Sequence, residues 1–160
     1  FADQPRDIHS PVVYGKLHAF VGWYRTITER DSNISIKYAF DLLRKPNHLW
    51  FHKNNMRILW GVPLLVAVFD WKLALAGFGL VTMLGLIQDN SVNVYGHIKG
   101  WFGYRNFETK DDSRNNFLLF PLILGEAWHN NHHANAQLVS TKVRRYEYDP
   151  IGVLINFIKH

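Results

Sequence analysis

The sequence lacks cysteine altogether, and this absence excludes several kinds of site from its 160 residues. Without thiols the chain forms no internal disulfide, holds no iron–sulfur cluster and builds no thiolate zinc site. A metal ion bound here must be held by histidine, aspartate, glutamate or asparagine. The chain also lacks internal repeats and low-complexity linkers, so we expect a single domain. It lacks an initiating methionine and a recognisable signal peptide, and from its start at Phe1 we expect a partial chain.

Acidic residues are fewer than basic ones, which leaves a formal net charge of +5 in a chain with six Trp, seven Tyr and eleven Phe. This balance suits nucleic acid, an anionic membrane face and an acidic cofactor equally. A non-catalytic basic module that binds membranes or nucleic acid is therefore one possible function. The placement of the residues has to decide between these classes.

Charge is nearly missing from residues 58–87, where Asp70 and Lys72 are the charged residues. One membrane-spanning helix needs about 20 apolar residues, so this run is too long for one span and short for two. A tight hairpin over about 56–97, turning between the two charges, resolves the conflict. Two buried helices of a soluble protein are the alternative. Before this run, apolar residues at helical spacing predict an amphipathic helix over 31–43.

The two ends of the predicted hairpin carry polar residues. Lys53 and Arg57 flank its entry, and by the positive-inside rule they place both ends in the cytoplasm. If the second arm stays helical to its end, Asp89, Asn93 and His97 recur every fourth residue and share one helix face. We expect that face to lie just beyond the apolar zone.

The densest group of metal-binding side chains is the segment GEAWHNNHH, residues 125–133, with His129, His132 and His133. Two of these imidazoles share a helix face, and the third lies about one residue further round the helix axis. One short segment can therefore provide ligands to two neighbouring metal ions. Imidazole and carboxylate without sulfur suit iron, zinc or manganese, and O₂-activating non-haem iron is well matched. Zinc hydrolysis is the chemical alternative. The polar neighbours that we expect to hold the ligating rings in place are Glu126, Asn130 and Asn131.

These motifs together resemble a known family. GEAWHNNHH, preceded by FGYRNFETKDDSRNN and by NVYGH, is similar to the third histidine box and its approach in membrane-bound fatty acyl desaturases of the stearoyl-CoA delta-9 class. RDIHSP followed by VGW resembles the stretch after that family's second box. The resemblance implies an all-α fold, an integral membrane helical bundle with a cytosolic cap that carries a histidine-rich di-iron site. Residues 1–160 would be the C-terminal part of that domain, without its N-terminal helices.

The same resemblance implies roles for particular residues. His97, His129, His132 and His133 would bind two non-haem iron ions, and Asn93 would reach one iron through a water molecule. The family's first and second boxes are absent, so the other ligands would lie outside this chain, and the fragment alone would be inactive.

This sequence also departs from the family pattern. Asp89 and Asn90 replace a Thr-Trp pair near the family's acyl channel, so we expect them to contact substrate. Phe20 replaces the histidine of the family's Ser-His-Val-Gly-Trp motif, with His18 nearby. The basic residues that we expect to meet an anionic head group such as CoA are Arg105, Lys110 and Arg114.

The function implied by the resemblance is O₂-dependent desaturation of an acyl-CoA or acyl-lipid, which leaves a cis double bond at delta-9. An external electron donor of the cytochrome b5 or ferredoxin type would reduce the iron. We expect a multi-pass protein of the endoplasmic reticulum or bacterial inner membrane, with its active site on the cytoplasmic side and no nucleic-acid partner. A membrane di-iron hydroxylase of fatty acids or alkanes is the alternative, because the same kind of oxidant can return oxygen to the carbon radical.

Overall fold

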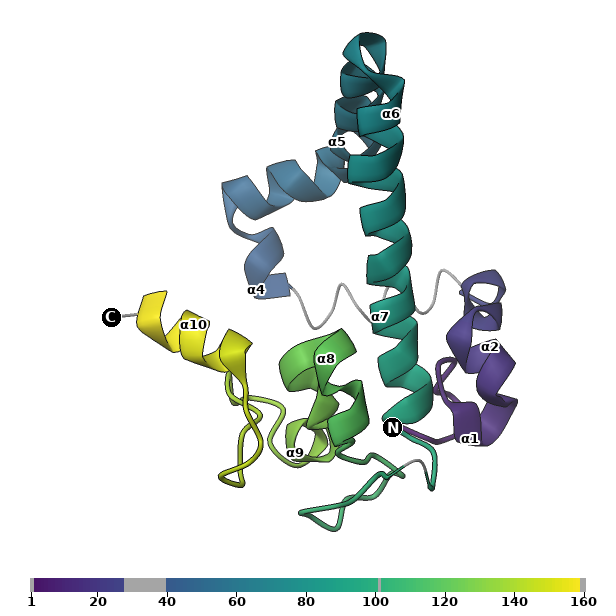
Figure 1. Cartoon of the computed structure of the whole chain (residues 1–160), viewed down its shortest axis with the longest axis vertical. Coiled ribbons are helices and arrows are strands. Elements are labelled where there is room, and N and C mark those ends of the chain that lie inside the picture. The colour runs from purple at the N-terminus through teal and green to yellow at the C-terminus, as the bar shows by residue number, and fades with distance from the viewer. Residues whose placement is uncertain (1, 28–39, 101, 159–160) are drawn as a thin grey trace. The chain divides into compact units, whose positions relative to one another are not determined.

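The computed structural model describes residues 2–27, 40–100 and 102–158 (Figure 1). The chain divides into two compact units, one of residues 27–86 and one that combines residues 1–26 with 87–160. The described residues form helices and no named strand, which confirms the all-α class for this part of the chain. Most of the helix predicted over 31–43 lies outside the described residues, and α4 (Phe40–Leu43) is its described end.

The described part of unit 27–86 is helical, and the chain reverses direction at Asp70, between α5 and α6. Its elements are α4 (Phe40–Leu43), α5 (Pro46–Phe69), α6 (Trp71–Ala74), the π-helical segment η2 (Leu75–Leu80) and the start of α7 (Val81–Tyr95). Asp70 separates the two arms, because its extended backbone ends α5 while its carboxylate caps α6 by accepting hydrogen bonds from the backbone N–H groups of Lys72 and Leu73. The second arm then packs against α5.

Residues Trp71–Tyr95 form one continuous helix of 25 residues, which is long and apolar enough to cross a membrane. No other described helix meets that criterion. The first arm falls short because the polar residues of its first half, including Lys53 and Arg57, leave a short apolar stretch before Asp70. The structure therefore offers one candidate span where the sequence predicted two membrane arms.

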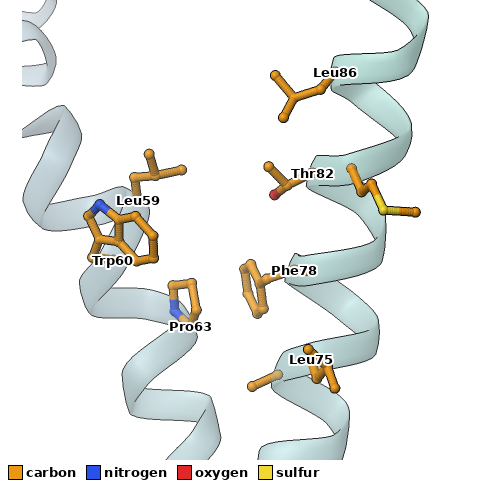
Figure 2. Close-up of a pocket in the computed structure, with 10 residues that line it drawn as sticks. Leu59, Trp60, Pro63, Leu75, Phe78, Thr82 and Leu86 are labelled. Atoms are coloured by element: carbon orange, nitrogen blue, oxygen red, sulfur yellow. The ribbon is translucent and has the colours of Figure 1, made fainter. Parts of the chain in front are cut away.

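An apolar groove of about 430 Å³ lies between α5 and the second arm. Figure 2 shows Trp60 and Pro63 of α5 facing Phe78 of η2 across it. Large apolar side chains on both arms are also exposed, among them Leu65 and Val81. An exposed apolar surface of this kind is typical of a segment that contacts lipid or another protein chain.

The other unit surrounds the end of α7 with short helices. They are α1 (Pro11–Tyr14), α2 (Lys16–Phe20), η1 (Gly22–Arg25), η3 (Phe117–Leu119), α8 (Phe120–Ile123), η4 (Leu124–Ala127), α9 (His129–Ala134) and α10 (Pro150–Ile158). Two small apolar clusters hold them, one around Ala19, Val94 and Ile98 and one around Ile123 and Trp128. Among the described residues, buried polar side chains outnumber buried apolar ones. Hydrogen bonding therefore positions the segments of this unit as much as apolar packing does.

Candidate metal centre

Three imidazoles from two distant segments meet in the unit that contains the end of α7. His97 lies two residues beyond α7, and His129 and His133 stand four residues apart on α9, where that spacing puts them on one face. One nitrogen from each ring can be chosen so that all three lie within 4.8 Å of one another. The Nε2 atoms of His97 and His129 are 2.9 Å apart. This group has the size and the ligand types of a metal site.

Gly96 allows this close approach. A Cβ atom at this position would lie 2.5 Å from the carbonyl oxygen of Val92 and 2.8 Å from Cδ2 of His129. The chain nevertheless stays in a helical turn here, since the backbone N–H of Gly96 donates to Val92. A residue without a side chain is therefore needed directly before His97.

Two carboxylates orient two of the rings. Nδ1 of His97 lies 2.8 Å from Oδ2 of Asp3, and Nδ1 of His133 lies 2.7 Å from Oδ2 of Asp111. An ionised carboxylate only accepts hydrogen bonds, so each Nδ1 carries the proton and each Nε2 is left as the metal-binding nitrogen. Sequence reasoning missed both acids, because in a polar opening and a polar loop they look like ordinary solvated residues.

Both acids are held in their ionised form. Burial acts to raise the pKa of Asp3, but hydrogen bonds from His97 and Ser10 outweigh it and lower the pKa. At Asp111 burial acts in the same direction, and hydrogen bonds from Ser113, His133 and Thr109 hold the pKa well below its usual range. A negative charge behind a ring raises the basicity of its other nitrogen and so strengthens metal binding.

His129 is buried, as is His97. Burial is the main reason that the pKa of His129 lies well below the ordinary value, and the neighbouring His97 and His133 add to the effect. The Nδ1 atom of His129 is buried and has no hydrogen-bond partner among the described residues. The ring is therefore neutral, the form that binds metals, and it retains unused bonding capacity. These features fit a metal ion that accepts nitrogen and oxygen ligands.

Two further predicted ligands lie beside this group. The ring centroid of His132 is 5.9 Å from that of His129 and 5.8 Å from that of His133, and His132 is not one of the three clustered rings. Asn93 is half-buried on α7, four residues before His97. His132 thus lies on α9 next to the group of three rings and outside it.

The residues predicted to hold the ligating rings in place, Asn130, Asn131 and Glu126, make different contacts. The amides of Asn130 and Asn131 do not hydrogen-bond to the imidazoles in the described structure; they tie α9 to neighbouring segments. The carbonyl oxygen of the Asn130 side chain accepts from the backbone N–H groups of Asn106 and Phe107, at 2.8 and 2.9 Å. Glu126 is exposed on η4. The two asparagines thus position the helix rather than the rings.

The predicted head-group residues lie along the 105–114 loop. Arg105 braces this loop, since its guanidinium donates to the carbonyl oxygens of Phe107 and Thr109. Lys110 is exposed, whereas Arg114 is half-buried with a buried Nε. Of the three, Lys110 is the side chain most open to an incoming anion.

The two predicted substrate residues of α7 differ in exposure. Asp89 is exposed, while Asn90 is buried and accepts a hydrogen bond of 3.0 Å from the indole Nε1 of Trp23. Asn90 also contacts Tyr24, with its amide nitrogen 3.4 Å from the hydroxyl. Asn90 therefore joins α7 to η1.

No model of a known protein family matches the chain, and no solved structure matches it either. Curated proteins do match. The chain is 29% identical to a hex-5-enoyl-(acyl-carrier protein) acetylenase of Moorena producens over 93% of its length, and 31% identical to an sn-2 palmitoyl-lipid 9-desaturase of a Nostoc species over 71%.

It is also 31% identical to the delta-9 desaturase-like 1 protein of Arabidopsis thaliana over 99% of its length. In each case the chain spans about half of the relative's length or less, with 51%, 39% and 52% of the three relatives covered. The match to the Arabidopsis protein covers 99% of the chain, so it includes the segments that form the histidine group. The chain belongs to the fatty acid desaturase family.

Proposed function

We propose that the protein is an O₂-dependent fatty acyl desaturase that inserts a cis double bond at delta-9, with two iron ions as cofactor. The observation that carries the proposal is the buried group of His97, His129 and His133, backed by carboxylates, in a chain whose relatives are named desaturases. His132 and, through a water molecule, Asn93 would complete this chain's share of the ligands. The other ligands would come from the part of the protein outside this chain.

Bound iron would supply the oxidising power that cleavage of an unactivated C–H bond requires. The residues of this chain have the task of holding and orienting. His97 and His133 present Nε2 because Asp3 and Asp111 accept the protons on Nδ1. Burial of His129 keeps water away from that ring and keeps it neutral. Each of these effects favours a preformed site.

Two apolar features of the chain support a lipid substrate. The helix Trp71–Tyr95 and the apolar groove in Figure 2 suit hydrocarbon chains, as in a multi-pass membrane protein with its active site on the cytoplasmic side. An acyl-lipid or an acyl-CoA is the proposed substrate, and Lys110 is exposed where it can meet an anionic head group. Electrons would come from a partner protein of the cytochrome b5 or ferredoxin type.

An acetylenase is the second candidate function. The relative from Moorena producens is named for a hex-5-enoyl group carried by acyl-carrier protein, and the similarity covers 93% of the chain. Such an enzyme also removes two hydrogens, but from a carbon pair that is already unsaturated. The two functions therefore differ in substrate and not in the kind of site.

The test is expression of the full-length protein and of its His129→Ala variant in a host, followed by mass spectrometry of the fatty acids. We expect saturated chains to lose two hydrogens and to gain a double bond at carbon nine, with no product from the variant. Conversion of alkenyl chains alone would favour the acetylenase. A product that gains one oxygen would show a hydroxylase and would overturn the proposal.

A further inference from the structure

Glu147 is a fully buried carboxylate outside the histidine group, with 0% of its surface exposed. Among the described residues it forms no ion pair with lysine, arginine or histidine. Its oxygens are instead surrounded by donors: the hydroxyl of Tyr104, the side-chain amides of Asn106, Asn115 and Asn131, and the backbone N–H groups of Val143 and Arg144. A buried carboxylate is costly unless its hydrogen bonds are satisfied, and these donors offset that cost.

The donors join Glu147 to the helix that carries the metal-binding histidines. The amide nitrogen of Asn131, which stands between His129 and His133 on α9, donates to Oε2 of Glu147 at 2.9 Å. The carbonyl oxygen of the same side chain accepts from Asn106 and from Asn115, each at 2.9 Å.

The two amides that donate to Asn131 also donate to Oε1 of Glu147, at 2.7 Å from Asn106 and 3.4 Å from Asn115. Glu147 and Asn131 are thus linked directly and through two shared partners. In these hydrogen bonds each donor points toward the carboxylate of Glu147 or toward the carbonyl oxygen of Asn131. The side-chain amides of Asn106, Asn115 and Asn131 are therefore each held in one orientation.

A second route leads from Glu147 to His133. The backbone N–H of Asn106 donates to the side chain of Asn130, which secures the start of the loop that contains Asp111. Asp111 in turn accepts from Nδ1 of His133. The loop and the helix are therefore fixed by the same carboxylate.

The helix itself has little that would fix its place. α9 has six residues, and its N-cap residue Trp128 makes no side-chain capping bond; the backbone N–H of Asn131 in its first turn donates instead to the side chain of Asn115, at 3.2 Å. A helix this short is not stable by its own backbone hydrogen bonds, so its position depends on its neighbours. The hydrogen bonds of Asn130 and Asn131 are the main polar contacts that fix the position of α9.

We propose that Glu147 is a positioning residue for the metal centre: it holds Asn131 and the Asn106 loop, and through them it sets the position of the helix that carries His129 and His133. This inference rests on the proposed metal centre and deepens it. It requires that a change at Glu147 alters metal binding, and not stability alone.

Asp149 provides a matched control. It is also a buried carboxylate, 3% exposed, and lies two residues further along the chain. Its hydrogen bonds come from the backbone N–H groups of Thr141 and Gly152 and from the hydroxyl of Thr141, and none comes from α9 in the described structure. Its link to α9 is indirect, through the carbonyl oxygen of Thr141, which accepts from the Asn131 amide at 2.8 Å. Loss of its charge leaves the bonds that Asn131 makes with Glu147, Asn106 and Asn115 in place, so it should destabilise the fold without changing metal binding.

The experiment compares cobalt(II) binding by the full-length protein, Glu147→Gln and Asp149→Asn, with the visible spectrum and thermal unfolding of each. In Glu147→Gln an NH₂ group replaces one carboxylate oxygen, so a hydrogen-bond donor faces the donors that surround this position. We expect cobalt affinity to fall about tenfold or more, as for other residues that support ligands, and the ligand-field bands to shift. Asp149→Asn should unfold at lower temperature and keep the wild-type affinity and spectrum.

Wild-type affinity and spectrum in folded Glu147→Gln would overturn the proposal, and so would an equal loss in Asp149→Asn. If Glu147→Gln does not fold, Glu147→Asp replaces it, because it keeps the charge and withdraws the carboxylate by one methylene. Unchanged cobalt binding in Glu147→Asp would then overturn the role of Glu147. If the wild-type protein binds no cobalt, the metal centre and this inference both fail, so the two failures are distinguishable.

Discussion

Nδ1 of His133 lies 2.7 Å from Oδ2 of Asp111, across 22 residues of sequence. The other carboxylate oxygen of Asp111 is fixed as well, since it accepts from the hydroxyl of Thr109 at 2.8 Å and from the backbone N–H of Ser113 at 3.1 Å. The loop before α8 thus holds an acid in place behind one metal-binding ring. This pair and the similar pair of Asp3 and His97 make the histidine group more than a cluster of neighbouring rings.

Replacement of Asp111 by alanine should weaken metal binding by about 10- to 100-fold, because His133 loses the acceptor that fixes its orientation. Chelator competition with cobalt(II) measures this affinity. Asp112→Ala is the control, since among the described residues its carboxylate pairs with the exposed Lys99 alone, at 3.8 Å, in an ion pair worth little. An equal loss in both variants would show that the effect is one of net charge and not of ring orientation.

The histidines should separate into two classes when each is replaced by alanine. His97 belongs to the group of three, so His97→Ala should abolish the tight site; His132 lies outside that group. We therefore expect His132→Ala to lower the iron content of the purified full-length protein but to leave one tightly bound ion. Metal analysis with stepwise chelation gives both quantities. Complete loss of metal from His132→Ala would contradict this division.

Gly96→Ala should disturb the centre from its backbone side. The added Cβ would meet the Val92 carbonyl oxygen at 2.5 Å and His129 at 2.8 Å, so the backbone or the ring has to move. Overpacking of this kind costs about 1–3 kcal/mol, and we expect a lower unfolding temperature together with weaker cobalt binding.

Gly85→Ala tests the same substitution within α7, where nothing lies within 4 Å of the new methyl group. It should leave the unfolding temperature unchanged or raise it slightly, because alanine favours helix more than glycine does. A similar loss in both variants would mean that α7 tolerates no alanine at a glycine position, whatever the space around it.

Local patterns in the sequence predicted much of what lies near the site. The HNNHH run placed His129 and His133 on a shared helix face. The prediction that Asn93 and His97 share one helix was based on a helix that continues to His97, whereas α7 ends at Tyr95 and His97 lies two residues beyond it. Asp70, a charged residue in an apolar run, marks the end of α5. Each of these features depends on residues close together in the chain, where helical geometry alone decides the arrangement.

The partners of the histidines could not be predicted in this way. Asp3 meets His97 across 94 residues, and no periodicity links two such positions. Glu147 lies in a basic, aromatic strip whose other side chains are mostly exposed, so its burial depends on where the 104–115 loop folds. Hydrogen bonds between loops are set by tertiary structure, and a single sequence carries no local signal for them.

Asn90→Ala should destabilise the protein more than its position on α7 suggests. The change removes the acceptor of the indole N–H of the half-buried Trp23, and loss of such a hydrogen bond costs about 0.5–1.5 kcal/mol. Thermal unfolding would measure the loss of stability, and tryptophan fluorescence would report the changed environment of Trp23. Asp89→Ala, at the exposed neighbouring position, should change stability by about 0.5 kcal/mol or less. A stable Asn90→Ala variant with altered chain-length preference would favour a substrate role over this packing role.

The charge of Glu147 should appear in the pH dependence of stability. Burial acts to raise the pKa of this carboxyl, but hydrogen bonds from Tyr104, from the backbone of Arg144 and Val143 and from Asn106 outweigh it, so the folded pKa lies below the ordinary value. Its contribution to stability is then complete above the unfolded pKa, about 4.3, and is lost as pH falls through the folded pKa.

The difference in unfolding free energy between wild type and Glu147→Gln should therefore be constant from about pH 7 to pH 5 and should shrink below about pH 4.3, where the unfolded chain begins to take up the proton. Denaturant titrations at several pH values, without metal, give this difference. Glu108→Gln, at a side chain that is 96% exposed, should show no such change. A difference that grows on acidification would mean that Glu147 is protonated in the folded protein, and its hydrogen bonds would then have to be assigned with the carboxyl as a donor.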